Sequence, residues 1–213
     1  MKKIAVLLLS ILGCAANPPP TSWPTRGTLR DAQDSTVYLA DKEDGQIFCS
    51  GVIIDDDRVL TANHCTNGGE FGVAYGHQVD SDGVATVARL PSSIRHIAER
   101  DQAILTVQLP GRQRRMHFSR DYAVGDPVFV VGAPRGLVGS VTFGRVSAIR
   151  TFPSEEAFID EVPLRGEWVQ VDAGVHPGNS GGPCFDGNGD LVGSVSFYYA
   201  RSPLLGGIIP FRR

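Results

Sequence analysis

The stretch Gly178-Asn179-Ser180-Gly181-Gly182-Pro183 is the most informative part of this sequence for both its fold and its chemistry. It places a serine in a glycine-rich turn, directly after a run typical of a strand, 168–171. Glycine adopts conformations that other residues avoid, so the N–H groups of Gly178 and Ser180 can point into one small space. Two such donors beside a hydroxyl would form an oxyanion hole for acyl transfer. The same composition is also ordinary for a turn without chemistry, and the motif alone leaves both interpretations open.

A serine hydroxyl is a weak nucleophile until a base takes its proton. Among five histidines, His64 ends a strand-like apolar run, Val59-Leu60-Thr61-Ala62-Asn63-His64-Cys65. The end of this run resembles the Thr-Ala-Ala-His-Cys motif of trypsin-like (chymotrypsin-fold) serine proteases, and 178–183 resembles their nucleophile motif. The resemblance predicts Ser180 as the nucleophile and His64 as its base.

The resemblance also predicts an acid between these two motifs. Asp101, in Arg100-Asp101-Gln102-Ala103-Ile104-Leu105, matches the Asp-Ile-Ala-Leu-Leu pattern of the family, and Gln102 departs from the usual apolar residue. The order His, Asp, Ser fits this fold and neither the subtilisin nor the α/β-hydrolase order. The chain therefore predicts a triad of His64, Asp101 and Ser180.

The remaining acids and histidines near these motifs fit surface roles better. Five aspartates are expected in solvated turns: Asp55, Asp56, Asp57, Asp80 and Asp82. Three histidines lie in polar contexts typical of surfaces or loops: His77, His96 and His117. No histidine or cysteine pair has a zinc-ligand spacing, so we expect no metal and no cofactor.

Further stretches narrow the resemblance to the catalytic domain of bacterial HtrA (Deg) proteases, without PDZ domains. They are 130–137, 141–149 and 169–173. The residue before Ser180 is Asn179, where pancreatic-type enzymes carry an aspartate that pairs with a new N-terminus. The chain also lacks the Ile-Val-Gly-Gly start of those enzymes. The resemblance therefore implies a site that needs no zymogen cleavage.

The same resemblance implies an all-β fold of two six-stranded antiparallel β-barrels, with the active site in the cleft between them. We expect a protease domain over 30–213, with a first barrel at about 30–111 and a second at about 120–211. Short β-rich runs between Gly, Asp and Asn turns fit this fold. They include 36–39, 47–54, 103–107, 127–131, 141–149, 168–171 and 191–199.

The N-terminus resembles an export signal. Met1-Lys2-Lys3 is positive, and the apolar core 4–12 is too short to span a bilayer. Ile11-Leu12-Gly13-Cys14 resembles a bacterial lipobox, which predicts a signal peptide at 1–13, lipidation of Cys14 and a Pro-rich tether at 14–29. Because Ala15 follows the lipidated cysteine, the sorting of Gram-negative lipoproteins would favour anchoring of the protein in the outer membrane, on its periplasmic side. The alternative is ordinary cleavage near 15–17 and a secreted soluble protein.

The other cysteines fit an oxidising compartment. Cys49 and Cys65 fall where the family places its histidine-loop disulfide. Cys184 has no partner, and Pro183 and Phe185 beside it suggest a buried, inert thiol. A reactive second nucleophile is the alternative.

By the same resemblance, Gly174 lies at the base of the primary specificity pocket, with Val175 and His176 beside it. Ser196-Phe197-Tyr198 is expected to form the wall strand that pairs with the substrate backbone. With no charge at the base, we expect a small or apolar residue before the scissile bond. His176 is either a plain loop residue or a group that recognises an acidic side chain.

A formal charge of −3 gives no reason to expect nucleic-acid binding. The basic run 112–115 fits a solvated linker between barrels, with an anionic partner or a proteolytic nick as alternatives. The sequence thus predicts a serine endopeptidase acting on peptide bonds of exported or extracellular proteins. A protease-fold binding protein with a closed or partner-activated site, and an esterase, remain as alternatives.

Overall fold

The computed structural model describes residues 22–110, 116–152, 158–159, 162–199 and 202–211. Cys14, the predicted signal peptide, the first half of the predicted tether (14–21) and the basic run 112–115 lie outside these residues. No helix within the described part of the chain is long and apolar enough to cross a membrane.

The first half of the chain forms an antiparallel sheet of six strands in the order β4-β1-β2-β3-β6-β5. Its strands are β1 (Thr36–Asp41), β2 (Ile47–Asp55), β3 (Arg58–Thr61), β4 (Phe71–Tyr75), β5 (Ser93–Ile97) and β6 (Gln102–Thr106). Short 3-10 turns interrupt them: η1 (Asn63–Thr66), η2 (Gly76–Gln78) and η3 (Ala98–Arg100). One face packs a core of apolar side chains from several strands, among them Val37, Leu39, Val59, Val73 and Leu105.

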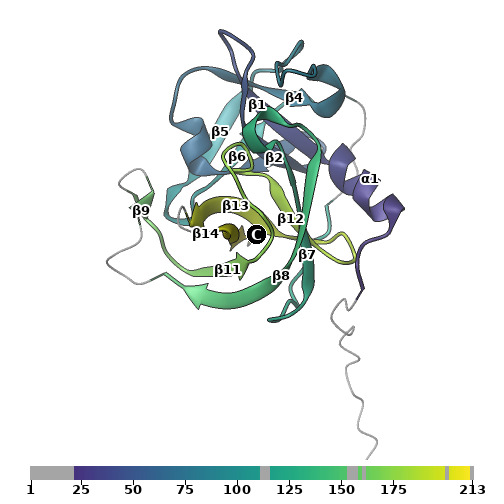
Figure 1. The fold of residues 1–213 in the computed structure, drawn as a ribbon. Helices are drawn as coiled ribbons and strands as arrows, with labels where there is room; N and C mark the ends of the chain where they lie inside the picture. The colour runs from purple at the N-terminus through teal and green to yellow at the C-terminus, as the bar shows by residue number, and fades with distance from the viewer. Residues whose placement is uncertain (1–21, 111–115, 153–157, 160–161, 200–201, 212–213) are drawn as a thin grey trace, which may run out of the picture.

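The second half forms a closed six-stranded barrel in the order β11-β14-β13-β12-β7-β8. Its strands are β7 (Pro127–Gly132), β8 (Ser140–Thr151), β11 (Glu167–Val171), β12 (Pro183–Asp186), β13 (Leu191–Tyr199) and β14 (Ser202–Pro210). The second half also contains a separate small hairpin of β9 (Phe158–Ile159) and β10 (Val162–Pro163) and the short turn η4 (Pro134–Gly136). In Figure 1 this barrel lies below the first sheet.

The predicted all-β fold with two six-stranded antiparallel units is confirmed, with two differences in detail. The first sheet is not closed by a continuous ladder, because β4 and β5 do not pair. Instead, an isolated antiparallel bridge joins Val73 of β4 to Arg89 in the segment before β5. In addition, a helix, α1 (Arg26–Asp34), begins inside the range predicted as tether. Thr25 caps it by accepting a hydrogen bond from the Thr28 N–H.

A third apolar cluster joins the two halves of the chain. The first sheet contributes Val52, Leu60 and Ile104, which meet Phe129 and Phe185 of the second barrel. Ala32 of α1 packs against the same cluster, so the helix lies across the junction on one side of the molecule (Figure 1). Apolar burial of this kind holds the halves in one relative position.

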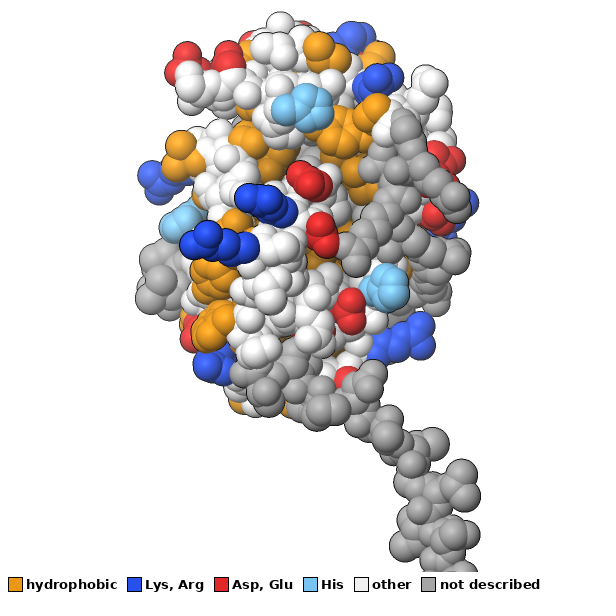
Figure 2. Space-filling model, turned by 90° about the vertical axis from the view of Figure 1, so that its right-hand side faces the viewer, with side chains coloured by type: hydrophobic (Ala, Val, Ile, Leu, Met, Phe, Trp, Pro, Cys, Tyr) orange, Lys and Arg blue, Asp and Glu red, His pale blue; other side chains and the backbone are white. Residues whose placement is uncertain are grey.

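The face on the right-hand side of Figure 1, turned toward the viewer in Figure 2, carries Lys and Arg side chains interspersed with Asp and Glu. Mixed charges of this kind produce no strong field of one sign over the face.

Candidate active site

His64 and Asp101 meet at one end of the first sheet. His64 lies in η1, directly after β3, and Asp101 lies between η3 and β6. The Nδ1 atom of His64 is 2.9 Å from Asp101 Oδ2 and 3.1 Å from Oδ1, and the backbone N–H of His64 donates to Oδ1 at 3.0 Å. Because a carboxylate only accepts, Nδ1 carries the proton, and Nε2 is the acceptor nitrogen of the neutral ring.

The Asp101 carboxylate also reaches the second barrel. Ser196 donates its hydroxyl to Asp101 Oδ2 at 2.5 Å. Ser196 lies at a register shift between Val195 and Phe197, where β13 carries an extra residue against β14. Such a bulge redirects a side chain. Asp101 is only 2 % exposed, whereas His64 is 23 % exposed, so the aspartate is buried behind an imidazole that reaches solvent.

Ser180 lies in the turn before β12, and the first sheet holds the backbone of that turn. The Ser50 N–H donates to the Ser180 carbonyl at 2.8 Å, and the Ser50 hydroxyl donates to the Gly178 carbonyl at 2.7 Å. The Ser180 carbonyl oxygen is also 3.7 Å from Cys65 Sγ, the residue after His64. Gly181, at φ +78°, has no room for a Cβ, which would collide with Ser50 and Ala62. The fold therefore brings the Ser180 turn against the turn that carries His64.

The N–H groups of Gly178 and Ser180 remain available to a ligand. Within the described residues, neither donates to a protein acceptor. The Pro177 carbonyl accepts from the Arg135 N–H at 2.8 Å. In a trans peptide the N–H points opposite to the carbonyl, so the Gly178 N–H points away from Arg135. Backbone N–H groups without a partner are uncommon in folded proteins, so these two donors are candidates for binding a ligand.

The predicted disulfide between Cys49 and Cys65 is present and lies beside His64. The two sulfurs and a His64 ring nitrogen lie within 4.8 Å of one another, but sulfurs joined in a disulfide are not thiolate ligands. Cys184 is the free cysteine of the described chain, and it is fully buried. Burial, with a smaller contribution from Asp186, raises the pKa of its thiol far above the usual range, which fits an inert residue.

The residues predicted to line the specificity pocket lie on two neighbouring segments. The Gly174 carbonyl accepts from Thr142 of β8 at 3.0 Å, and a Cβ added at Gly174 would meet open space. Val175 is buried beside Gly206 of β14, and His176 is partly exposed. On β13, Phe197 packs edge-on against Trp168 at 5.0 Å. The Tyr198 backbone belongs to the same strand, and its side chain lies outside the described structure.

Of the acids set aside in the sequence, Asp55 is the last residue of β2 and pairs with Arg58 of β3, so it does not lie in a turn as predicted. The other four lie in or beside turns, as predicted. Asp80, for example, accepts from the Asp82 and Val84 N–H groups. His96 is exposed, but its Nδ1 is 2.7 Å from Asn63 Oδ1, so it braces the turn before His64.

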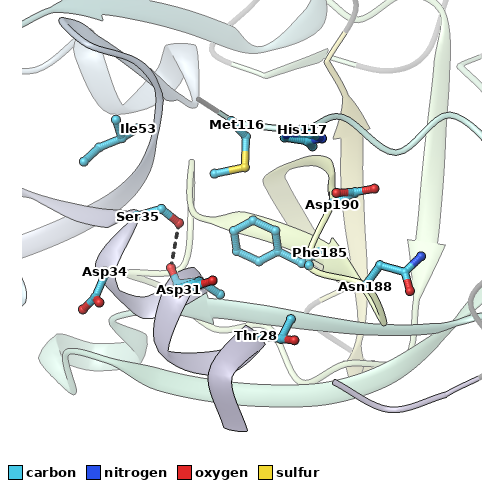
Figure 3. Close-up of a pocket in the computed structure, with 12 residues that line it drawn as sticks. Thr28, Asp31, Asp34, Ser35, Ile53, Met116, His117, Phe185, Asn188 and Asp190 are labelled. Carbon is cyan, nitrogen blue, oxygen red and sulfur yellow. Dashed lines mark hydrogen bonds between the residues drawn. The ribbon is translucent and has the colours of Figure 1, made fainter. Parts of the chain in front are cut away.

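A cavity of about 430 Å³ lies away from the predicted triad. Figure 3 shows it between α1, the turn that ends β12, and the segment of Met116 and His117. Asp31 and Asp34 of α1 stand on one side, and Phe185 forms part of the floor. None of the predicted site residues lines this cavity.

Sequence reasoning missed Ser50. It follows Cys49 in a strand, and nothing in its neighbourhood signals that its hydroxyl will reach a turn 128 residues away. Only the pairing of the two halves brings the segments together.

Comparison with protein families matches residues 49–193 to a family described as the trypsin-like peptidase domain. A probable periplasmic serine endoprotease DegP-like of Brucella suis is 37 % identical over 154 residues, which cover 71 % of this chain and 27 % of the relative. The chloroplastic Protease Do-like 1 of Arabidopsis thaliana is 34 % identical over 113 residues, covering 52 % and 25 %. The chain thus spans about a quarter of the length of these curated relatives.

Solved structures share the fold. The active form of the Rv3671c protease from M. tuberculosis has a TM-score of 0.70 and 22 % identity, covering 97 % of this chain and 89 % of that one. The HtrA-type protease AlgW, solved with a decapeptide, has a TM-score of 0.68 and 21 % identity, covering 86 % and 62 %.

Proposed function

This chain belongs to the trypsin-like peptidase family, and on that premise we propose that it is a serine endopeptidase with His64, Asp101 and Ser180 as its triad. One observation carries the proposal. The buried Asp101 carboxylate holds His64 through Nδ1, while the Ser180 turn is bonded to Ser50 of β2. This arrangement supports a base held in one tautomer next to a serine.

In the proposed reaction, Ser180 Oγ attacks the carbonyl carbon of a peptide bond, and His64 Nε2 takes the hydroxyl proton. The C–N bond then breaks, and His64 gives the proton to the leaving amine. Asp101 stabilises the imidazolium formed between these steps. Water, deprotonated by His64, hydrolyses the acyl-enzyme ester and restores the Ser180 hydroxyl.

The N–H groups of Gly178 and Ser180 are the proposed oxyanion hole. Their lack of protein acceptors and the direction of the Pro177 carbonyl support a hole that is already formed. The backbone geometry thus favours an active resting state over the alternative of a closed or partner-activated site.

We propose an uncharged specificity pocket with Gly174 at its base, flanked by Val175, His176 and the strand of 196–198. Open space above Gly174 supports room for a side chain. We expect cleavage after small or apolar residues. A peptide-library profile dominated by Lys, Arg, Asp or Glu before the scissile bond would contradict this.

For location, we propose export and lipidation at Cys14, which would hold the protease at the periplasmic side of a membrane. The names of the DegP-like relatives, which call them periplasmic, support export. Expression of the whole precursor in a bacterial host, followed by intact mass, tests this. We expect a diacylglyceryl mass on wild type and none on Cys14→Ser. A soluble product cleaved near residues 15–17 in the wild type would contradict lipidation.

The decisive test is labelling of the mature protein with a fluorophosphonate, read by intact mass. We expect one adduct on wild type, and none on Ser180→Ala or His64→Ala. A Cys184→Ala variant is the control and should label like wild type, because that thiol is buried. No adduct on folded wild type would contradict a formed site and favour the partner-activated alternative. Turnover of casein against a small activated ester then separates a peptidase from an esterase.

A further inference from the structure

Gln102 is a buried polar residue that the proposed mechanism does not use. It begins β6 immediately after Asp101 and is 2 % exposed. The sequence marks it only as a departure from an apolar residue. A buried amide without partners destabilises a fold, so its hydrogen bonds show what it is held against.

The Gln102 side chain crosses from the first sheet into the second barrel. Its Nε2 donates to Ser194 Oγ at 3.1 Å and to the Ile209 carbonyl at 3.0 Å. A carbonyl oxygen only accepts, so the nitrogen side of the amide must face it. Ser194 on β13 and Ile209 on β14 are direct cross-strand partners. One side chain of the first sheet therefore bonds both members of a registered pair in the second barrel.

The backbone conformation of Asp101 explains why Gln102 reaches that pair. Neighbouring residues of a regular strand point to opposite faces. Asp101 is left-handed, at φ 47° and ψ 45°, which breaks this alternation. As a result both side chains contact β13, Asp101 through Ser196 and Gln102 through Ser194, two residues apart.

We propose that Gln102 is a positioning residue that locks the start of β6 onto the Ser194–Ile209 pair and so holds Asp101 between His64 and Ser196. The proposal rests on the proposed triad and deepens it. Without the amide, two side-chain bonds near Asp101 would still tie this segment to the second barrel: Ser196 to the Asp101 carboxylate, and Arg100 Nη2 to the Pro210 carbonyl of β14. Neither holds the start of β6 itself, where Gln102 stands. The carboxylate would then move relative to the imidazole, while the Gly178 and Ser180 N–H groups, on the other half, would keep their places.

The test compares Gln102→Met, which keeps length and volume but removes both donors, with Val128→Ala, a buried site in β7 of the second barrel, as a stability control. We expect Gln102→Met to lower kcat about tenfold or more, since displacing a catalytic group by a fraction of an ångström has effects of this order. KM should stay within about twofold, since substrate contacts are unchanged. The acid limb of the kcat/KM profile should move to lower pH, because a displaced carboxylate stabilises the His64 imidazolium less. Val128→Ala should lower the melting temperature and leave the pH profile in place.

A second readout does not depend on turnover. The proton on His64 Nδ1, bonded to Asp101, should give a far-downfield NMR signal in wild type and in Val128→Ala. In Gln102→Met we expect this signal to weaken through faster exchange with water. If Gln102→Met does not fold, Ser194→Ala, which keeps the bond to Ile209, should show the same changes to a smaller degree.

The proposal would be overturned if Gln102→Met kept the downfield signal unchanged and had the same kcat as Val128→Ala. If Gln102→Met does not fold, the same result in Ser194→Ala would overturn it. If wild type does not react with a fluorophosphonate, the proposed function fails separately. The NMR comparison then still decides whether Gln102 holds Asp101 against His64.

Discussion

Removing the Cys49–Cys65 disulfide should destabilise the protein by about 3 kcal/mol while leaving its fold intact. The bond ties the start of β2 to η1, and both cysteines are buried. A double variant, Cys49→Ala with Cys65→Ala, removes the cross-link without adding a polar group to the core.

The magnitude follows from the length of the loop that the bond closes. The cysteines are 16 residues apart. In the chain-entropy model, freeing a loop of this length returns about 10 cal/mol/K to the unfolded chain, or about 3 kcal/mol at room temperature. For a domain of this size that corresponds to a fall in Tm of about 6 to 12 °C.

Urea unfolding, followed by the fluorescence of Trp168, measures the change directly, because this indole is only 5 % exposed in the folded protein. Wild type is compared with and without reductant. The double variant is the control and should be insensitive to reductant. Reduced wild type should be about as stable as the double variant, since both have lost the same cross-link.

A difference of less than about 1 kcal/mol between oxidised and reduced wild type would contradict the prediction, because it is too small for a loop of this length. Equal destabilisation of the double variant by reductant would also contradict it, since the lost stability would then come from elsewhere. Labelling of Ser180 in the same samples separates stability from activity, because Cys65 adjoins His64 and its sulfur contacts the Ser180 carbonyl.

Three further predictions concern single side chains. The Gly174→Asp variant should fold normally, because a Cβ at this position meets open space. In a peptide library, its cleavage should then favour Lys or Arg before the scissile bond by roughly tenfold. An unchanged cleavage profile would show that Gly174 does not line the specificity pocket. The Asp101→Asn variant should have a kcat about 10⁴-fold lower at neutral pH, because an amide N–H facing Nδ1 favours the wrong tautomer of the His64 imidazole. A loss of less than about tenfold in kcat would contradict the proposed triad. Burial raises the pKa of Asp186 against the opposing effect of its hydrogen bonds, chiefly from Ser119. The folded state thus holds this proton more tightly than the unfolded chain, so the free energy of unfolding should fall as the pH rises from the ordinary carboxyl range to the raised pKa. Asp186→Asn keeps an oxygen for the Asn188 and Asp190 N–H groups and should abolish that fall in urea titrations across the acidic range; an unchanged pH dependence would contradict it.

The sequence predicted most of the fold because the decisive residues stand in local motifs. A histidine after an apolar strand and a serine among glycines each report their surroundings within a few positions. The disulfide could be predicted for the same reason, since Cys65 adjoins His64 in the motif.

Features that depend on contact between the halves were not predictable. Ser50 and Gln102 act across the junction, and neither has a local pattern that announces a partner about a hundred residues away. Gln102 departed from the apolar residue that the motif led us to expect. Its hydrogen bonds to β13 and β14 explain why a polar side chain is buried there. The helix α1 was missed because its nine residues hold only two apolar side chains, Leu29 and Ala32, which are too few to indicate a helix in the sequence.

The division of the site between two halves of the chain has a consequence for when proteolysis can begin. His64 and Asp101 come from the first sheet, and Ser180 comes from the second barrel, 116 residues after His64 and 79 after Asp101 in the order of synthesis. A precursor whose halves have not docked carries every proposed catalytic side chain but lacks the Ser50 and Ser196 bonds that assemble them. Cleavage competence therefore arises last, after the apolar junction has formed. If the proposed function holds, a newly made copy cannot cleave other copies until its two halves have docked, and by then its own chain is folded and harder to cleave.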